Sequence, residues 1–154
     1  MGPPMSPPTG SLQASELSPD VDAAIRARVL AIPVFTALRF SDLRLRHGEA
    51  SCRVPWPREY DGIFESFHGG LMLTVADSAA AIAVLTVTGA SERIATTDMS
   101  IRFLAPVRSA ITVTARVLKA GRTLVPVEAE ILDDGGRLAA VAQITYMRVP
   151  GKAA

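Results

Sequence analysis

The sequence predicts an α+β fold in which an antiparallel sheet wraps around one central apolar helix. Residues 69–87 are apolar nearly all round the helix that they would form, and such a helix is buried on every side. Four later runs alternate apolar and polar residues with a period of two, which is typical of strands with one buried face. A sheet that covers the helix satisfies the burial requirements of both kinds of element.

Composition and charge narrow the class of protein. A chain of 154 residues with 49% hydrophobic and 20% charged residues has the size and composition of one globular domain. Its 16 Lys and Arg residues against 15 Asp and Glu leave no basic footprint, so we expect no nucleic-acid partner. The single cysteine, Cys52, excludes an internal disulfide and a cysteine-based zinc site, and it fits a reducing compartment. We therefore expect a cytoplasmic protein without a metal site.

The N-terminal part divides into a tail and the start of the domain. Residues 1–18 are rich in Pro, Ser and Gly, and we predict a disordered tail there. Residues 19–150 form the predicted single domain. Ser18 can cap a helix over 20–31, and Pro33 ends that helix.

The remaining elements follow from alternation and from breaker residues. Alternation predicts strands over 38–46 and 50–56, and breakers predict a loop over 57–67. The four later strands are expected over 93–104, 110–119, 122–132 and 137–148. Residues 133–136 form a predicted hairpin turn, because glycine accepts positive φ. Pro126 cannot donate a ladder hydrogen bond, so its strand is expected at a sheet edge or with a bulge.

A membrane span is the disfavoured alternative for the apolar helix. Residues 71–87 fall slightly short of the about 20 apolar residues that a span needs. Asp77 lies near their middle, where a carboxylate costs about 2.5–3.5 kcal/mol on insertion. We therefore expect no membrane partner.

The first group of chemically informative residues lies at the start of the apolar helix. His68, Gly69 and Gly70 stand where a loop enters it. Backbone N–H groups of the first turn have no partner within their own helix and lie at the positive end of its dipole. The glycines allow a ligand oxygen to approach this backbone closely, which predicts an oxyanion site. The alternative for His68 is a residue that caps or packs at the helix start.

Asp77 is the second chemically informative feature. A carboxylate among apolar neighbours is either a structural Asp bonded to an amide or arginine, or a base or nucleophile. Gly69 lies eight positions earlier, which is about 12 Å along a helix. One carbonyl cannot touch both residues, because reacting atoms come within about 3–3.5 Å. If both act on one substrate, the protein is a symmetric dimer with two shared sites, formed by antiparallel copies of the helix.

Several motifs in order resemble one known family. They are His68-Gly69-Gly70 with Asp77 nine residues after the histidine, the stretch TTDMSIRFLAP at 96–106, Gly121-Arg122, the stretch DGGRLAA at 134–140, and Thr145-Tyr146. Over roughly residues 35–149 the chain resembles the hotdog-fold thioesterases of the PaaI type. The resemblance implies a sheet wrapped around a central helix, with homodimers often paired into homotetramers. It also implies hydrolysis of acyl-CoA thioesters without a metal or cofactor.

The resemblance also implies roles for individual residues. Asp77 would be the base or nucleophile, and the Gly69 N–H would polarise the thioester carbonyl. His68 would assist nearby, and Thr96 would hold the attacking water or orient the carboxylate. The residues expected to contact the substrate are Gly70, Phe67, Thr97 and Arg122, with Phe64 a further candidate for the acyl pocket. For Thr96 the alternative is an ordinary strand threonine, and for Arg122, a candidate for a CoA phosphate, a solvated hairpin arginine.

The chain departs from the family pattern at one position. Many relatives have Asn six residues before the histidine, where this chain has Gly62. Asp61, Glu65 and Ser66 are the nearby residues that could substitute for it.

The expected function is an acyl-CoA thioesterase that releases a free acid and CoA, with the acyl group in an apolar pocket between subunits. The alternative is a non-catalytic hotdog domain that binds acyl-CoA. The missing Asn favours this alternative mildly, and the presence of Asp77 argues against it. A hotdog dehydratase needs a histidine-based acid–base site on a differently arranged motif, for which the sequence offers little support.

Overall fold

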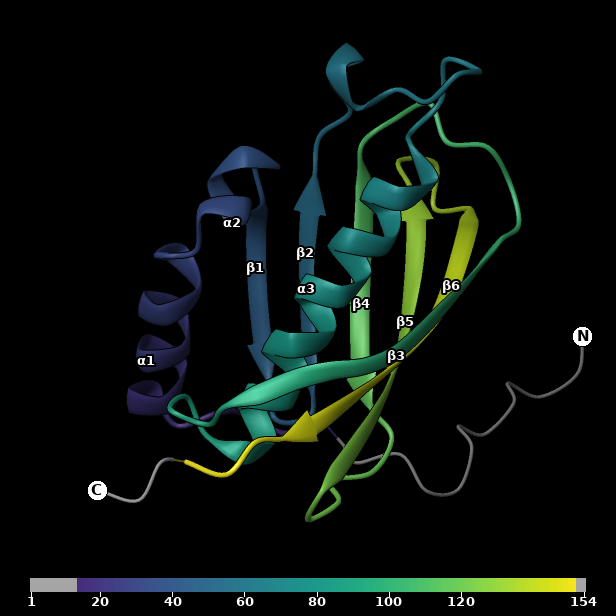
Figure 1. Ribbon diagram of the computed structural model, residues 1–154. Coiled ribbons are helices and arrows are strands. Elements are labelled where there is room, and N and C mark those ends of the chain that lie inside the picture. Colours follow the sequence, from purple (N-terminus) through teal and green to yellow (C-terminus); the bar gives the residue numbers. More distant parts are fainter. Residues whose placement is uncertain (1–13, 152–154) are drawn as a thin grey trace, which may run out of the picture.

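A computed structural model describes residues 14–151 and shows one antiparallel sheet curled around a long helix (Figure 1). The strands are β1 Ser41–Arg46, β2 Glu49–Val54, β3 Ile94–Phe103, β4 Ile111–Val117, β5 Leu124–Asp133 and β6 Leu138–Arg148. The helices are α1 Pro19–Leu30, α2 Pro33–Ala37 and α3 Gly69–Thr88, and a 3₁₀ turn covers Arg58–Tyr60. The six strands lie in the order β1-β2-β4-β5-β6-β3. The predicted α+β class with a central helix is confirmed.

The core lies between α3 and the concave face of the sheet, and small apolar side chains form both surfaces. Fully buried residues on α3 are Val75, Ala76, Ala79, Ala80, Ala83 and Val84, and they face strands that carry Val113, Ala115 and Ala129. A stripe on the other side of α3 stays half-buried or exposed and comprises Gly70, Thr74, Asp77, Ser78 and Ala81. The prediction that this helix is buried on every side is therefore wrong within one chain, because the sheet and α1 cover only part of its surface.

The N-terminal helices form a corner beside α3. Ser18 Oγ accepts a hydrogen bond from the Val21 N–H at 3.4 Å, so the predicted first helix and its cap are confirmed. Pro33 follows the end of α1 and also occupies the first turn of α2, a position that suits its fixed φ. The sequence analysis missed α2. Strand β1 consequently begins at Ser41 rather than at residue 38.

The other strand boundaries agree with the predictions to within two residues, but the placement of Pro126 is a correction. Strand β5 is an inner strand between β4 and β6, and it has no bulge at Pro126. The Leu118 N–H donates to the Pro126 carbonyl at 2.9 Å, one residue past the end of β4. In an antiparallel pair the N–H and C=O of a residue point to the same neighbour. The missing N–H of Pro126 therefore faces a place where β4 has already ended.

Strand β3 forms one edge of the sheet. Most of its side chains are exposed, among them Met99 at 44% and Phe103 at 52%. Its pairing with β6 shifts register between Thr96 and Asp98, which marks a bulge. A long exposed edge strand is a template for pairing with another chain.

The turn between β5 and β6 supports the loop that joins β3 to β4. Asp133 Oδ1 accepts hydrogen bonds from the N–H groups of Gly135 and Arg137, at 3.0 and 2.9 Å. Gly136 takes φ 79°, as the predicted hairpin turn requires. The Arg137 guanidinium donates to the Pro106 carbonyl at 2.7 Å. Two of the family-like stretches, at 96–106 and 134–140, are thus joined structurally.

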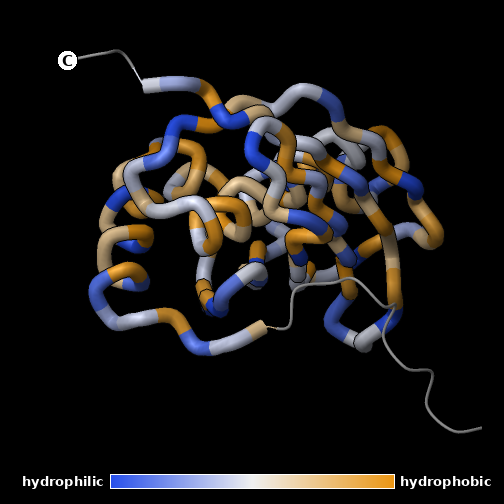
Figure 2. Tube along the Cα trace, turned by 90° about the horizontal axis from the view of Figure 1, so that it is seen from below, coloured by the Kyte–Doolittle hydropathy of each residue, from blue (hydrophilic) through white to orange (hydrophobic). Residues whose placement is uncertain are grey.

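Two further features concern hydropathy and the chain start. Hydrophobic and hydrophilic residues alternate along much of the trace in Figure 2. Within residues 14–151, α3 alone is long and apolar enough by length and composition to cross a membrane, and more than half of its apolar window is buried inside the fold. Residues 14–18 form no helix or strand, and residues 1–13 of the expected tail lie outside the described residues. The expected boundary between tail and domain stays a prediction.

Candidate active site

The side chains of two strand residues meet the carboxylate of Asp77. Asp77 is on the half-exposed stripe of α3, and Thr96 and Tyr146 are cross-strand partners on β3 and β6. The Thr96 hydroxyl donates to Asp77 Oδ1 at 3.0 Å, and the Tyr146 hydroxyl lies within hydrogen-bond reach of the same Oδ1 and of the Asp77 backbone carbonyl. Figure 1 shows how the curl of the sheet carries β3 and β6 across α3.

The two hydroxyls divide the Asp77 carboxylate into a held oxygen and a free one. Both donors act on Oδ1, and within residues 14–151 no hydrogen-bond donor reaches Oδ2. Tyr146 is 2% exposed, and burial, followed by the hydrogen bond and charge of Asp77, raises the pKa of its hydroxyl far above the ordinary value. The phenol therefore stays a neutral donor. An oriented carboxylate with one unpaired oxygen can take a proton from water or attack a carbonyl carbon.

A cavity of about 250 Å³ lies against this carboxylate, and we name it the Asp77 cavity. Its polar lining consists of Asp77, Ser78, Thr96 and Tyr146. Its apolar lining comes from the α1–α2 corner, from α3 and from the start of β3, and comprises Val29, Ile32, Val34, Phe35, Ala81, Ile82, Leu85 and Ile94. The Asp77 cavity thus combines an apolar interior with a few polar groups, which is the usual character of a small-molecule site.

The start of α3 matches the capping interpretation of His68. His68 is the N-cap residue, and its Nδ1 accepts a hydrogen bond from the Gly70 N–H at 3.0 Å. In neutral imidazole the other nitrogen then carries the proton, so Nε2–H is a donor on an exposed side chain. A Cβ at Gly70 would lie 3.0 Å from the His68 ring, which explains the glycine. The Gly69 N–H has no acceptor among the residues that the structure describes.

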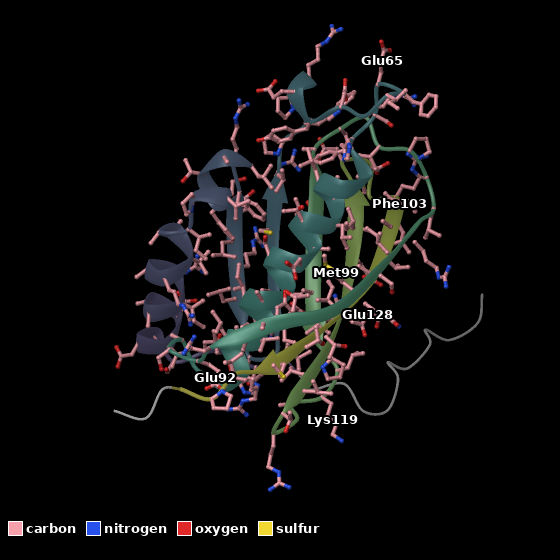
Figure 3. The ribbon with its side chains drawn as sticks, viewed as in Figure 1. Glu65, Glu92, Met99, Phe103, Lys119 and Glu128 are labelled. Atoms are coloured by element: carbon pink, nitrogen blue, oxygen red, sulfur yellow. The ribbon has the colours of Figure 1, made fainter. Side chains whose placement is uncertain are left out.

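A second hollow, of about 350 Å³, opens beside Gly69, and we name it the Gly69 hollow. It is lined by Ser66, Phe67, Gly69, Met72, Phe103, Leu104, Ala105 and Pro106. A Cβ at Gly69 would lie 2.9 Å from Cζ of Phe103, so any larger residue there requires the aromatic ring to shift. Figure 3 shows Phe103 near the end of β3 that lies beside the start of α3. Phe67 is 5% exposed and Phe64 is 81% exposed, and neither lines the Asp77 cavity of its own chain.

The structure does not bring Asp77 and Gly69 together within one chain. They are eight residues apart on α3, or about 12 Å, and they line different hollows. If Asp77 and Gly69 act on the same substrate, they must therefore come from two copies of α3.

Thr97 and Arg122 lie outside the Asp77 cavity. The Thr97 hydroxyl donates to the Thr145 carbonyl at 3.1 Å. Arg122 lines a third hollow, of about 520 Å³, which we name the arginine hollow because Arg93 and Arg148 line it too. Arg148 Nε pairs with Glu92 at 2.8 Å. The substrate roles expected for these residues stay predictions.

Gly62 stands where many relatives have Asn, and its surroundings show what Asp61 contacts and how a Cβ would fit there. Asp61 Oδ1 accepts a 2.6 Å hydrogen bond from the Trp56 indole, so its carboxylate is already engaged. A Cβ at Gly62 would lie 3.8 Å from His68 Cα and Cδ2, in ordinary contact. A Cβ at this position would therefore fit beside His68 without a clash. Within residues 14–151 no cluster of three or more His, Cys, Asp or Glu residues could hold a metal ion.

Sequence reasoning placed Tyr146 in a family-like motif without assigning it a role, and it did not single out Arg93. The signal for Tyr146 is its place in an alternating strand beside Ile144, because a buried tyrosine hydroxyl usually has a hydrogen-bond partner. Nothing in the sequence pointed to Arg93, because only the fold brings this residue, which precedes β3, beside Arg122.

Comparisons with known proteins agree with the fold. A family model described as "Thioesterase superfamily" matches residues 64–140. A protein of Saccharolobus solfataricus named "Putative esterase" is 31% identical over 110 residues, which are 71% of this chain and 78% of that protein. A thioesterase family protein of known structure from Silicibacter pomeroyi has a TM-score of 0.79 at 26% identity, covering 85% of this chain and 99% of that one. The PaaI protein of E. coli, from the phenylacetic acid degradation operon, has a TM-score of 0.79 at 22% identity, covering 88% and 98%.

These matches define the family. The chain belongs to the thioesterase superfamily, and its sheet and central helix form the hotdog fold. It is a thioester hydrolase.

Proposed function

We propose that the protein is a PaaI-type acyl-CoA thioesterase in which Asp77 performs the chemistry. The observation that carries the proposal is the Asp77 carboxylate itself. Oδ1 is held by Thr96 and Tyr146, and the unpaired Oδ2 stands at an apolar cavity. Such a carboxylate suits hydrolysis of a thioester that joins an apolar acyl group to a polar carrier.

Two routes begin at Asp77 Oδ2. In one, Oδ2 accepts a proton from water while the water oxygen attacks the thioester carbonyl, and the C–S bond breaks to give an acid and the CoA thiol. In the other, Oδ2 attacks the carbonyl carbon directly, the thiolate leaves, and water then hydrolyses the mixed anhydride. Single-turnover hydrolysis in oxygen-labelled water detects the direct route when water attacks the Asp77 carboxyl carbon of the anhydride, because solvent oxygen then enters Asp77, whereas the first route puts it only into the free acid.

A homodimer completes the site. Antiparallel copies of α3 would bring the partner subunit's Gly69 to Asp77, so that its free N–H polarises the carbonyl with the Nε2–H of the partner's His68 nearby. The half-exposed stripe of α3 and the exposed edge of β3 are the surfaces that such a dimer would cover. Pairing of two dimers into a homotetramer follows the family pattern.

The arginine hollow is the proposed contact for the CoA phosphates. Arginine suits phosphate because its guanidinium presents several donors in one plane. Arg122 there stands with Arg93 and Arg148, which extends the single contact expected from the sequence. Gly70, Phe67 and Thr97 complete the proposed substrate contacts, and the buried Cys52 fits work in the reducing cytoplasm.

The experiment measures thiol release from a panel of aromatic and fatty acyl-CoAs. Wild type is compared with Asp77→Ala and with Asp20→Ala, the same change at an exposed carboxylate on α1, which serves as the matched control. Loss of turnover in Asp77→Ala alone, with fold and oligomer intact, supports the proposal. Equal rates in all three proteins contradict it. Saturable acyl-CoA binding without turnover in wild type would support the alternative, a non-catalytic binding domain.

A further inference from the structure

We infer that the acyl group of the substrate enters the Asp77 cavity of the same chain, under the α1–α2 corner, and that this cavity limits the acyl group to medium length or a single ring. The inference rests on the proposed thioesterase function and names its substrate class. It differs from the expectation of an acyl pocket between subunits with Phe64 and Phe67 as candidates, because these residues do not line the Asp77 cavity of their own chain.

The position of the reacting oxygen selects the Asp77 cavity. The carbonyl carbon must come within about 3–3.5 Å of Asp77 Oδ2, or of a water that Oδ2 holds. The first carbons of the acyl group therefore lie in the space of which Asp77 is itself a wall. The Gly69 hollow and the arginine hollow have no Asp77 in their linings. Of these three hollows of one chain, the Asp77 cavity alone can therefore receive an acyl group that is attached to a carbon at Oδ2.

The direction of the cavity follows from helical spacing. Asp77, Ala81 and Leu85 are successive i, i+4 positions on α3 and all line the cavity. Leu85 is thus about 12 Å along the helix from Asp77. The acyl group runs from the polar end, at Asp77 and Ser78, toward the C-terminal end of α3.

The size of the cavity sets the limit. Its volume of about 250 Å³ corresponds to roughly eight non-hydrogen atoms at the ~30 Å³ that one water occupies in the liquid. An octanoyl, benzoyl or phenylacetyl group is of this size, and a palmitoyl group is about twice as large. Extra carbons that do not fit must displace the cavity walls before the carbonyl can reach Oδ2, which costs about 1–3 kcal/mol in a packed interior.

Substitutions at two residues should change the limit on acyl length in opposite directions. Ala81 lies midway along the cavity, and a larger side chain there would shorten it. Ile32 joins α1 to α2 and is 42% exposed, so its truncation would lengthen the cavity with little loss of core packing. Ala24 is an exposed residue of α1 and supplies a matched Ala→Leu control.

The experiment measures kcat/KM for straight acyl-CoAs from acetyl to palmitoyl in wild type, Ala81→Leu, Ile32→Ala and Ala24→Leu. We expect wild type to prefer medium chains over palmitoyl by at least about tenfold, which is the discrimination that one or two buried methylenes can give. Ala81→Leu should move the optimum to shorter chains, Ile32→Ala to longer ones, and Ala24→Leu should not move it. A profile that is flat through palmitoyl, or an optimum that neither cavity variant moves, overturns the inference.

A binding measurement separates this inference from the proposed function. Titration calorimetry of octanoate and palmitate with the Asp77→Asn protein needs no turnover. Octanoate binding that Ala81→Leu abolishes supports the cavity even if no thioester is hydrolysed, and in that case the proposed function alone fails. Equal binding of both acids, or binding that Ala81→Leu leaves unchanged, overturns the inference even if hydrolysis is normal.

Discussion

The hydroxyl of Tyr146 lies within hydrogen-bond reach of Asp77 Oδ1, and its ring is 2% exposed. The buried phenol on β6 thus fixes one oxygen of the carboxylate, and Thr96 on the edge strand β3 fixes the same oxygen. The consequence is that Oδ2 is the oxygen that meets the substrate. Four predictions test this arrangement and the structure that supports it.

Tyr146→Phe removes one of the two donors that hold the carboxylate. A hydrogen bond to a charged group is worth about 1.5–3 kcal/mol, so we expect kcat to fall by about tenfold to a hundredfold. Tyr60→Phe is the matched control, since the Tyr60 hydroxyl donates to the Ala37 carbonyl away from the site. An equal fall of kcat in both variants would argue against a positioning role for Tyr146.

Thr96 and its neighbour Thr97 should respond differently to the same substitution. Thr96→Val removes the donor to Asp77 Oδ1, and we expect a lower kcat with little change in KM. The Thr97 hydroxyl bonds the Thr145 carbonyl, so Thr97→Val should leave kcat unchanged and raise KM through the proposed substrate contact. Steady-state kinetics of the two variants measure both effects. A kcat loss in Thr97→Val as large as in Thr96→Val would contradict the account.

Gly69→Ala should impair turnover through a steric effect at the oxyanion site. The added Cβ would lie 2.9 Å from the Phe103 ring, which must move, and the ring is exposed enough to do so without unfolding the chain. We expect a lower kcat and a melting temperature within a few degrees of wild type. The double variant Gly69→Ala with Phe103→Leu should recover part of the activity. If activity does not recover, the added Cβ itself blocks the substrate from the residue 69 N–H, and the displaced Phe103 ring is not the cause.

Asp133 should make the stability of the chain depend on acid pH. The Arg137 N–H, then the Arg137 side chain and the Gly135 N–H, hold the pKa of the Asp133 carboxyl below its ordinary value, against a smaller opposing effect of burial. Because the folded-state pKa is lowered, the stabilisation is fully present above the unfolded-state pKa of about 3.9 and is lost as pH falls through the folded-state pKa. Asp133→Asn should therefore melt below wild type at pH 7 and nearly with it at about pH 2. Parallel melting curves at every pH would exclude this role.

The sequence predicts the elements whose burial is periodic. The apolar helix at 69–87 and the alternating strands were found because each repeats its burial pattern over many residues. Helix α2 was missed because five residues give no period, and Pro33 ends one helix and starts the next. The prediction for Pro126 was wrong because the N–H that proline lacks matters only where a neighbouring strand would accept a hydrogen bond from it.

Part of the site was also predictable. Asp77 stood out as a carboxylate in an apolar helix, and His68-Gly69-Gly70 as a glycine-rich helix start. Tyr146 did not stand out, because its role depends on the curl that brings β6 over α3. The α1–α2 wall of the Asp77 cavity could not be predicted, since it joins residues about fifty positions apart along the chain.

The most direct test of the central claim is kcat of Asp77→Asn in the thiol-release assay. The Asn side chain keeps an oxygen that accepts from Tyr146 and Thr96 and replaces only Oδ2 by an NH₂ group. Burial raises the pKa of Cys52 to about 12, so this thiol stays unreactive toward the disulfide reagent that reports CoA release. We predict a fall of about a hundredfold to ten-thousandfold with fold and oligomer preserved. A kcat within about twofold of wild type would contradict the claim that Asp77 Oδ2 carries out the hydrolysis.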